Sequence, residues 1–372
     1  MVCNNSSLQP RFIIFGLAHY AETNNRKRFR IFTNCPPVGE TQIKYKILEI
    51  LKDGQFHSGE SLGRALGVSR TAVWKQLQKL EAIGLQLESV KGKGYRVPQD
   101  FELLDHKQIT SHLSSSAQQQ LQQLQIYQTV DSTNKQANLA IAQQQSNRQS
   151  ASGTVILSEY QTSGRGRRGK QWISPFASNL YLSIVWDFEQ GATALQGLSL
   201  SIGVAVSRAL KQLGAQTVQL KWPNDIYINH KKLGGILLEM VGDPTGHCTV
   251  IIGIGINHHM PSRSGSDIDQ DWTDLKSTLS QSISRNQLTA YIINHSFAIL
   301  DGYQQQGFAS YRDEWQAIDA FWGKQATIST AKQSTTGTLL GVDKLGALQM
   351  QLENGEINSF IGGELSLRPV EK

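Results

Sequence analysis

The feature that most restricts how this chain can fold is a glycine–arginine loop, Gly164-Arg165-Gly166-Arg167-Arg168-Gly169. The segments on either side, 153–157 and 180–186, are rich in β-branched and other apolar residues, which predicts two buried strands. Glycine lets the backbone approach a ligand closely, and guanidinium groups bind carboxylate and phosphate oxygens in pairs. We therefore interpret the loop as an anion-binding clamp between two core strands. The alternative is a flexible basic turn.

Charge is distributed unevenly along the 372 residues. Residues 1–40 have a net charge of +3, residues 41–97 have ten Lys and Arg against five Asp and Glu, and the other 275 residues sum to −2. This distribution predicts a polyanionic partner for the front part only. The composition, 39% hydrophobic and 18% charged, is that of a soluble globular protein long enough for two or three domains.

No membrane segment is expected, because the longest apolar run near the start, Phe12 to Ala18, is too short to span a bilayer. The cysteines at 3, 35 and 248 lack disulfide or metal-ligand spacing, which indicates a reducing cytoplasm. Residues 1–42 have no sustained periodicity, and Pro36-Pro37 blocks a helix running out of them. We expect them to form an unstructured or poorly ordered tail.

Residues 43–98 have the pattern of a winged helix–turn–helix, in which a short turn containing glycine joins two helices. The expected elements are a helix from Ile43 to Leu51, a helix over 60–66 with Ser58 as N-cap, a turn at Gly67-Val68-Ser69, a helix from Arg70 to about Ile83, and a hairpin over 85–97 whose tip, 91–94, is the wing.

The helix from Arg70 buries Val73, Leu77 and Leu80, which leaves a basic and amide-rich face free. Such a face enters the DNA major groove and donates to base edges and phosphates. The alternative is a helical domain used only for packing. The residues that we expect to contact DNA are Ser69, Arg70, Thr71, Trp74, Lys75, Gln78, Lys91 and Lys93.

A second strong motif is Lys221-Trp222-Pro223-Asn224-Asp225. It follows a predicted strand at 218–220, and Pro223 bends the chain, so Lys221 lies at a strand end. A lysine there can neutralise charge that develops on a phosphoryl or carboxyl oxygen. The alternative is a surface lysine beside a packed Trp-Pro pair.

Two further predicted strands, 232–239 and 250–257, contain glycines. Gly253 and Gly255 alternate, so they remove side chains from one face only. They indicate either a flat slot for a ring or a strand crowded by a helix. Asp131-Ser132-Thr133-Asn134 is either a helix cap or a set of hydrogen-bonding groups for a polar ring. The amide of Gln161 similarly offers both a donor and an acceptor.

Glutamine-rich tracts flank this part of the chain. The run 114–125 is of low complexity, and we expect a mobile loop or frayed helix there. The tract 143–149 is expected to end the helix that follows Asn134. Four short strands at 326–329, 338–342, 347–351 and 357–361 indicate a small β domain at the end of the chain.

These motifs, in this order, resemble those of biotin–protein ligases. The helix–turn–helix with Lys91-Gly92-Lys93-Gly94-Tyr95 and the closing Gly362-Gly363-Glu364-Leu365-Ser366-Leu367-Arg368 are similar to the bifunctional bacterial type, which is also the biotin operon repressor. The resemblance covers roughly residues 43–372. It implies an α+β fold of three parts: a winged helix–turn–helix at 43–98, a catalytic domain with a mixed sheet and flanking helices at 99–323, and an SH3-like barrel at 324–372.

The resemblance also implies the reaction: biotin and ATP give biotinyl-5′-AMP, and biotin then passes to a lysine of a carrier protein. Arg165, Arg167 and Lys221 would be the catalytic residues. The biotin-binding residues would be Ser132, Thr133, Asn134, Gln161, Gly164, Arg165, Gly166, Arg167, Trp172, Lys221, Gly253 and Gly255. The ATP-binding residues would be Arg167, Arg168, Asn224, Asn257 and Trp272, and Mg²⁺ would accompany ATP without a carboxylate cage of its own.

The partners implied are the biotin carboxyl carrier protein of acetyl-CoA carboxylase, biotin operon operator DNA, and a second copy of the chain once biotinyl-5′-AMP is bound. The expected location is the cytoplasm. Two alternatives are a DNA-binding biotin sensor without turnover and a lipoate-attaching ligase of the same fold.

Overall fold

The computed structural model of the protein describes residues 40–98, 100–191, 195–243, 245–266, 268, 270–329, 334–362 and 366–369. Of the tail expected at 1–42, residues 1–39 lie outside the described residues. Helix α1 begins at Glu40, so the helical region extends slightly further toward the N-terminus than predicted. None of the described helices is both long and apolar enough to cross a membrane.

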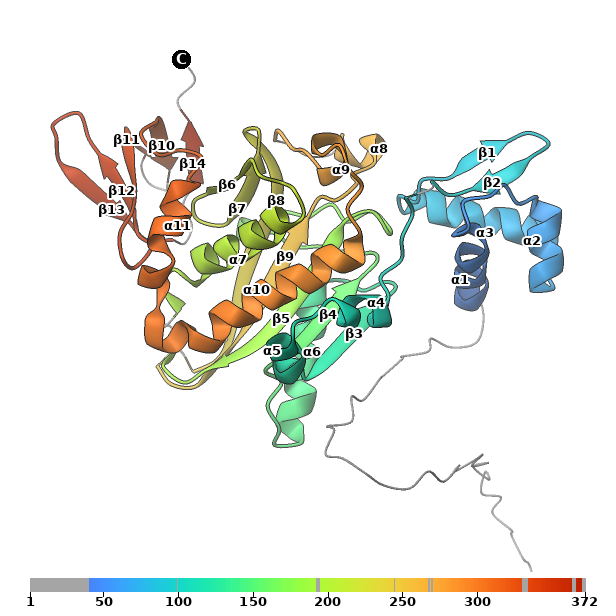
Figure 1. Ribbon diagram of the computed structural model, residues 1–372, viewed down its shortest axis with the longest axis horizontal. Helices are drawn as coiled ribbons and strands as arrows, with labels where there is room; N and C mark the ends of the chain where they lie inside the picture. The colour runs from blue at the N-terminus through green and yellow to red at the C-terminus, as the bar shows by residue number, and fades with distance from the viewer. Residues whose placement is uncertain are drawn as a thin grey trace, which may run out of the picture. The chain divides into compact units, whose positions relative to one another are not determined.

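The predicted winged helix–turn–helix is present, and its elements are labelled in Figure 1: α1 (Glu40–Leu51), α2 (Gly59–Leu66), α3 (Arg70–Ala82), β1 (Glu88–Val90) and β2 (Gly94–Arg96). The hydroxyls of Ser58 and Ser69 accept hydrogen bonds from the first turns of α2 and α3, as N-caps do. The inward side chains of α3 join a hydrophobic core with Leu48 and Leu62.

The central sheet has seven strands in the order β3-β4-β5-β9-β8-β7-β6. The pair β3–β4 is parallel and the other pairs are antiparallel, so the sheet is mixed as predicted. The strands are β3 (Gln123–Tyr127), β4 (Thr154–Ser158), β5 (Leu180–Phe188), β6 (Val218–Lys221), β7 (Asp225–Ile228), β8 (Lys231–Gly242) and β9 (Cys248–Ile256).

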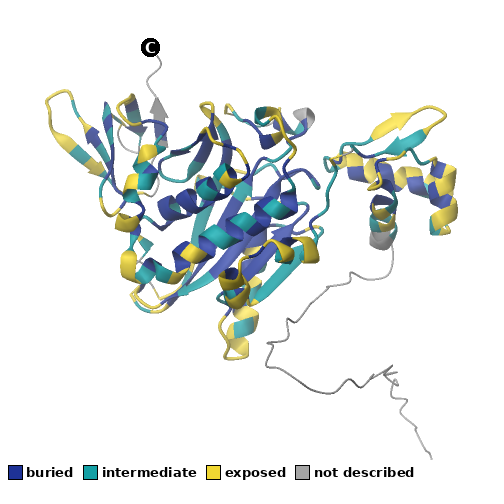
Figure 2. Cartoon of the chain, in the orientation of Figure 1, coloured by how far each residue is buried: buried dark blue, intermediate teal, exposed yellow. Residues whose placement is uncertain are grey.

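Helices α7 (Leu198–Gln212) and α10 (Arg285–Gln306) lie across one face of this sheet (Figure 1). Helix α6 (Thr133–Ser146) packs on β4, β5 and β9. The strands of the sheet and the inner sides of α7 and α10 hold most of the buried residues (Figure 2). Short helices connect these elements: α4 (His106–Ser111), α5 (Ser115–Gln120), α8 (Ser262–Gly265), α9 (Leu275–Thr278), α11 (Arg312–Ala317) and the 3₁₀ turns η1 (Arg167–Gly169) and η3 (Phe308–Ser310).

The glutamine-rich run 114–125 is not the mobile loop or frayed helix that the sequence suggested. Ser114 caps α5 by accepting a hydrogen bond from the Ala117 N–H, and Ala117 and Leu121 are buried in the main core. The chain then enters β3, the edge strand of the sheet. Ala117, Leu121 and the partly buried Leu124 are therefore enough to order a segment whose other positions are polar.

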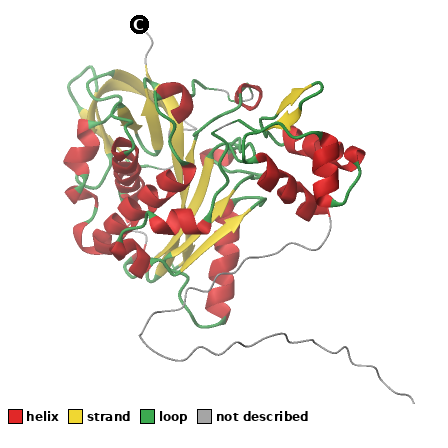
Figure 3. Ribbon diagram, turned by 45° about the vertical axis from the view of Figure 1, so that its right-hand side comes forward, coloured by secondary structure: helices red, strands yellow, loops and turns green. Residues whose placement is uncertain are grey.

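The C-terminal part forms a five-stranded antiparallel sheet in the order β13-β12-β11-β10-β14. Its strands are β10 (Gln325–Ser329), β11 (Ser334–Val342), β12 (Leu348–Gln351), β13 (Ile357–Phe360) and β14 (Ser366–Pro369). Figure 3 shows the strands of the molecule in yellow. The four predicted strands are present, and β14 lies in the closing motif, where no strand was expected. Within the described residues the sheet is SH3-like but does not close into a barrel.

Candidate functional site

The glycine–arginine loop is a small ordered hairpin between β4 and β5. The Gly166 N–H donates to the Lys170 carbonyl at 2.7 Å, and the Trp172 N–H donates to the Gly164 carbonyl at 2.9 Å. Arg168 adopts a left-handed backbone conformation with φ of 58° at the tip, and its side chain is exposed. The loop therefore presents its arginines from a fixed backbone rather than from a flexible turn.

Two arginines attach the hairpin to the sheet at separate points. Arg165 Nη2 lies 3.1 Å from Oε2 of Glu239 on β8, and Arg167 Nη1 lies 2.8 Å from Oδ1 of Asn224. Burial lowers the pKa of Arg167; the Asp225 carboxylate acts against this shift. Both guanidinium groups thus rest on side-chain oxygen atoms, which are the type of atom that a carboxylate or phosphate ligand would offer.

A chain of buried hydrogen bonds connects the predicted recognition residues. The Thr133 N–H donates to Gln161 Oε1 at 2.9 Å, and Gln161 Nε2 donates to Ser174 Oγ at 3.0 Å. Ser183 Oγ lies 2.8 Å from Thr133 Oγ1 and 2.6 Å from Asn134 Oδ1. These contacts bring Thr133, Asn134 and Gln161 together, as the sequence predicted, through two serines that it did not single out.

Ser132 precedes helix α6 and is only 4% exposed. Its side chain makes no capping hydrogen bond, unlike the caps of α2 and α3. Ser132 stands at the N-cap position of α6 without a side-chain cap. The cap interpretation of this stretch therefore does not hold for Ser132.

The alternating glycines of β9 make room for two side chains of the site. A Cβ on Gly253 would lie 2.4 Å from Asn134 Oδ1, and one on Gly255 would lie 2.6 Å from Trp172 Cε2. The expected flat slot is therefore occupied by Asn134 and Trp172 rather than open. Of the two explanations, crowding by a helix applies in part at Gly253, since Asn134 belongs to the first turn of α6.

A lysine–aspartate pair lies on the same face and was missed by the sequence reasoning. Lys232 Nζ is 2.7 Å from Asp225 Oδ1, both side chains are 16% exposed, and the ammonium is 5.9 Å from the centre of the Trp172 ring. Lys221, which was predicted, ends β6 opposite Asp225 of β7, with its Nζ 3.2 Å from the Tyr227 hydroxyl. No local sequence signal points to Lys232, because its place in the site depends on the pairing of β8 with β7.

Trp272 and Asn257 lie next to this pair. The Lys232 N–H donates to the Asp271 carbonyl, and the Thr273 N–H donates to the Lys232 carbonyl, so the Trp272 backbone runs beside β8. Asn257 Nδ2 donates to the Thr273 carbonyl at 3.1 Å. Among the described residues, its Oδ1 is buried without a hydrogen-bond partner. That oxygen is an acceptor left for a ligand.

A groove of about 500 Å³ opens beside Gln161 and Trp172. Ser174 and Tyr160 line the same side, and residues 81–87, at the end of α3 and the start of the wing, line the other. The volume is within the range of small-molecule sites. Two of the predicted biotin-binding residues therefore face a space of suitable size.

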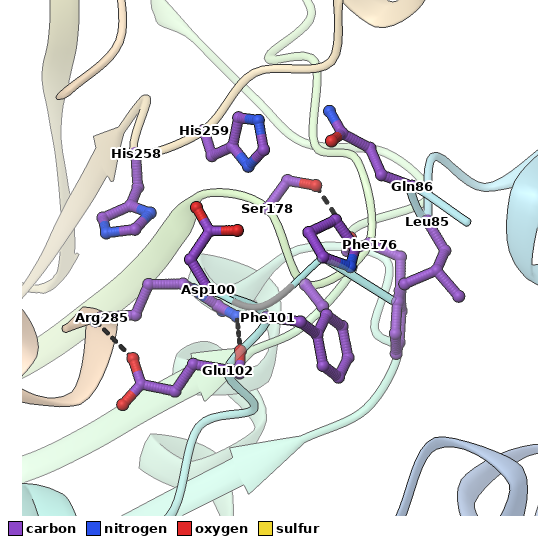
Figure 4. Close-up of a pocket in the computed structure, with 12 residues that line it drawn as sticks. Leu85, Gln86, Asp100, Phe101, Glu102, Phe176, Ser178, His258, His259 and Arg285 are labelled. Atoms are coloured by element: carbon purple, nitrogen blue, oxygen red, sulfur yellow. Dashed lines mark hydrogen bonds between the residues drawn. The ribbon is translucent and has the colours of Figure 1, made fainter. Parts of the chain in front are cut away.

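A separate, smaller cavity lies where the chain leaves the winged helix (Figure 4). His258, His259 and Asp100 surround it, and Arg285 forms a buried ion pair with Glu159 at 2.7 Å. Burial lowers the pKa of His258 to about 4. This cavity contains none of the predicted ligand-binding residues.

The eight residues predicted to contact DNA are all exposed, and Trp74 is 47% exposed on α3. On the wing, Lys93 and Arg96 pack their cationic groups over the Phe56 ring at 5.9 and 4.5 Å. No group of three or more His, Cys, Asp or Glu side chains within the described ranges is arranged to hold a metal ion.

Family models match the three parts of the chain. Residues 44–96 match an HTH domain, residues 126–257 match the biotin/lipoate A/B protein ligase family, and residues 322–368 match the biotin protein ligase C-terminal domain. The class that the fold and site define is thus a ligase of the biotin/lipoate type joined to a DNA-binding domain.

Similar proteins narrow this class. The bifunctional ligase/repressor BirA of Escherichia coli (strain K12) is 38% identical over 333 residues, which cover 90% of this chain and 99% of that protein. BirA of Bacillus subtilis (strain 168) is 30% identical over 305 residues, 81% of this chain and 91% of that protein. The chain therefore belongs to the family of bifunctional biotin ligase/repressors.

The fold agrees with a solved structure. The biotin protein ligase from Aquifex aeolicus in complex with biotin and ATP aligns with a TM-score of 0.56 at 27% identity, covering 66% of this chain and 99% of that one. The alternatives considered from the sequence, a sensor without turnover and a lipoate-attaching ligase, have no such support among these relatives.

Proposed function

We propose that this chain joins biotin to ATP to form biotinyl-5′-AMP, transfers biotin to a lysine of a carrier protein, and represses transcription in response to biotin. The observation that carries the proposal is the convergence of the glycine–arginine hairpin, the buried hydrogen-bond chain and the lysine–aspartate pair on one face of the sheet. Family membership supports both activities, because its relatives are bifunctional.

The first step requires two anions to meet, and cations held in place supply most of the catalysis. A carboxylate oxygen of biotin attacks the α-phosphorus of ATP, and pyrophosphate leaves. Arg165 would bind the carboxylate, and Arg167 would bind the phosphate in place of its contact with Asn224. Lys221 would stabilise the charge that both groups share in the transition state. The chain's own groups thus orient and neutralise the reactants without forming a covalent intermediate.

The position of Lys232 adds a further cation to Arg165, Arg167 and Lys221. The Lys232 ammonium is held by Asp225 and lies 5.9 Å from the centre of the Trp172 ring. Lys232 would neutralise charge on the phosphate. Trp272, whose backbone runs beside Lys232, would cover the adenine. Asn224, Asn257 and Arg168 complete the nucleotide side. Mg²⁺ would arrive on the phosphates of ATP, since its usual ligands there are phosphate oxygens and water.

The ring of biotin would be read by Ser132, Thr133, Asn134 and Gln161. The amides of Asn134 and Gln161 are held at both ends by neighbouring residues, and each NH2 group keeps a second N–H that can donate to the ligand. Trp172, with Gly164 and Gly166 behind it and Gly253 and Gly255 beneath, would enclose the apolar part of the ligand. In the second step the carrier lysine amine attacks the acyl carbon, AMP leaves, and the amine loses a proton.

The winged helix, for which we propose residues 43–98, would bind operator DNA of the biotin operon through α3 and the wing. A homodimer loaded with biotinyl-5′-AMP would pair two such units on a palindromic site. The acceptor would be the biotin carboxyl carrier protein, and the protein would be located in the cytoplasm. The catalytic domain would comprise residues 99–323, and the C-terminal domain would comprise residues 324–372. Strong exposure of all eight DNA-facing side chains supports the DNA assignment.

The decisive experiment combines both activities in one preparation. The protein is incubated with MgATP, biotin and a carrier domain, and biotin incorporation is followed by mass spectrometry; operator binding is measured with and without biotin. We expect incorporation into the carrier and tighter operator binding with biotin and ATP. Binding without incorporation would identify a sensor, and incorporation of lipoate in preference to biotin would identify a lipoate ligase.

A further inference from the structure

Glu239 has no part in the reaction described so far, yet it touches two of the residues assigned to biotin. It lies on β8, and its Oε2 atom accepts hydrogen bonds from Asn134 Nδ2 at 2.7 Å and from Arg165 Nη2 at 3.1 Å. One carboxylate oxygen therefore serves both the residue expected to read the ring and the residue expected to bind the carboxylate of the substrate.

The contact with Asn134 fixes the orientation of that amide. An ionised carboxylate only accepts hydrogen bonds, so the Nδ2 end of Asn134 faces Glu239 and the Oδ1 end faces Ser183. Asn134 is 3% exposed, and its hydrogen bonds leave the amide in one orientation. This contact is independent of whether Arg165 is bound to Glu239.

The contact with Arg165 is of another kind. The two side chains are 46% and 27% exposed, so their pairing is accessible to solvent and weak. The backbone hydrogen bonds of the hairpin and the contact of Arg167 with Asn224 do not involve the Arg165 side chain. Arg165 can therefore exchange one carboxylate for another without unfolding the loop.

We propose that Glu239 is a positioning residue that occupies Arg165 until the carboxylate of biotin replaces it. The proposal rests on the proposed function, because it requires Arg165 to bind the substrate carboxylate. The binding free energy gained from the biotin carboxylate is then the difference between the Arg165–biotin ion pair and the Arg165–Glu239 ion pair. It is smaller than the full free energy of the Arg165–biotin pair. Glu239 holds the guanidinium beside the site and lowers the affinity for any anion that competes for it.

The test compares biotin with its uncharged methyl ester, in Glu239→Gln and in the wild-type protein, by isothermal titration without ATP. Both ligands carry the same ring, so any effect of the substitution on Asn134 cancels in the ratio of their dissociation constants. We expect the preference for biotin over the ester to rise about two- to fivefold in E239Q, the range of a partly exposed ion pair. An unchanged or smaller preference would overturn the proposal.

Removing a negative charge near the site would also favour an anion without any exchange at Arg165. The substitution is therefore repeated in an Arg165→Ala background, where the effect of E239Q on the ratio should vanish. A rise that persists there contradicts the proposal. If R165A alone leaves the ratio unchanged, Arg165 does not bind the carboxylate, and it is the functional assignment that fails.

Two further variants serve as controls. Glu314→Gln removes an Arg–Glu pair of similar exposure between α7 and α11, where Glu314 binds Arg208, and it should leave the ratio unchanged. Glu239→Ser removes the charge with a smaller side chain, and it should change the ratio in the same direction as E239Q. Thermal unfolding confirms that each variant is folded before its ratio is compared, and opposite shifts in the two folded Glu239 variants would refute the exchange.

Discussion

Gly253→Ala should weaken biotin binding while leaving ATP binding unchanged. A Cβ at this position would lie 2.4 Å from Asn134 Oδ1 and 3.0 Å from its Cγ and Nδ2. Asn134 belongs to the first turn of α6 and is buried, so it relieves the overlap only by leaving its rotamer. Its hydrogen bonds to Glu239 and from Ser183 are then lost.

The magnitude follows from those contacts. Two buried hydrogen bonds contribute about 2 kcal/mol together, and overpacking in a core costs about 1–3 kcal/mol of stability. If the free energy of the two lost hydrogen bonds appears as weaker binding of biotin, the KM for biotin rises about thirtyfold, since about 1.4 kcal/mol corresponds to a factor of ten. The KM for ATP should stay within about twofold, because Asn134 hydrogen-bonds Glu239 and Ser183, whereas Asn224 hydrogen-bonds Arg167 and the Ile236 carbonyl.

The assay is biotin-dependent exchange of pyrophosphate into ATP, with each substrate varied in turn, together with thermal unfolding. Gly246→Ala is the matched control. Gly246 lies in the turn between β8 and β9, the strand that contains Gly253, and a Cβ on Gly246 would meet no atom closer than 3.5 Å. A G253A protein that is folded and keeps the wild-type KM for biotin would refute the role of Asn134.

Three other predictions concern different parts of the chain. Arg167→Gly should release biotinyl-5′-AMP and label lysines on bystander proteins, as detected by streptavidin blotting, whereas retention of the intermediate would contradict the clamp. Trp74→Ala should weaken operator binding at least about fivefold in a mobility-shift assay with carrier biotinylation unchanged, and an equal loss of both activities would indicate misfolding instead. Burial raises the pKa of Asp319 to about 6, against an ordinary value of 3.8, so the folded chain loses stability as the pH rises through this interval. Asp319→Asn keeps the acceptor for the Phe321 N–H and should therefore raise the free energy of unfolding by up to about 3 kcal/mol at pH 8 but not at pH 3.5, as measured by urea denaturation; equal gains at both would contradict this.

Much of the fold followed from local patterns. The spacing of Val73, Leu77 and Leu80 predicted the buried side of α3, and the β-branched runs predicted β4, β5 and β9. These patterns succeed because burial of one face determines both the period and the residue types. The prediction for the run 114–125 failed for the opposite reason, since Ala117, Leu121 and the partly buried Leu124 are too few to give a period.

The site was predictable where a motif is contiguous and not where it is assembled by pairing of strands. Arg165 and Arg167 stand in one loop, so the sequence indicated a clamp. Glu239 and Ser183 reach the site because β8 and β5 both pair with β9, a register that no local pattern encodes. Lys232 is similar: its meaning depends on Asp225 in the neighbouring strand and on the position of Trp172.

The central claim is that the hairpin arginines, together with Lys221 and Lys232, bring a biotin carboxylate onto the α-phosphate of ATP. Exchange of radiolabelled pyrophosphate into ATP measures that step alone, without a carrier or DNA. We predict exchange that requires biotin, is not supported by lipoate, and falls at least about a hundredfold when both Arg165 and Arg167 are replaced by alanine. Exchange that persists at the wild-type rate in the double variant, or none in the wild-type protein, would contradict the account.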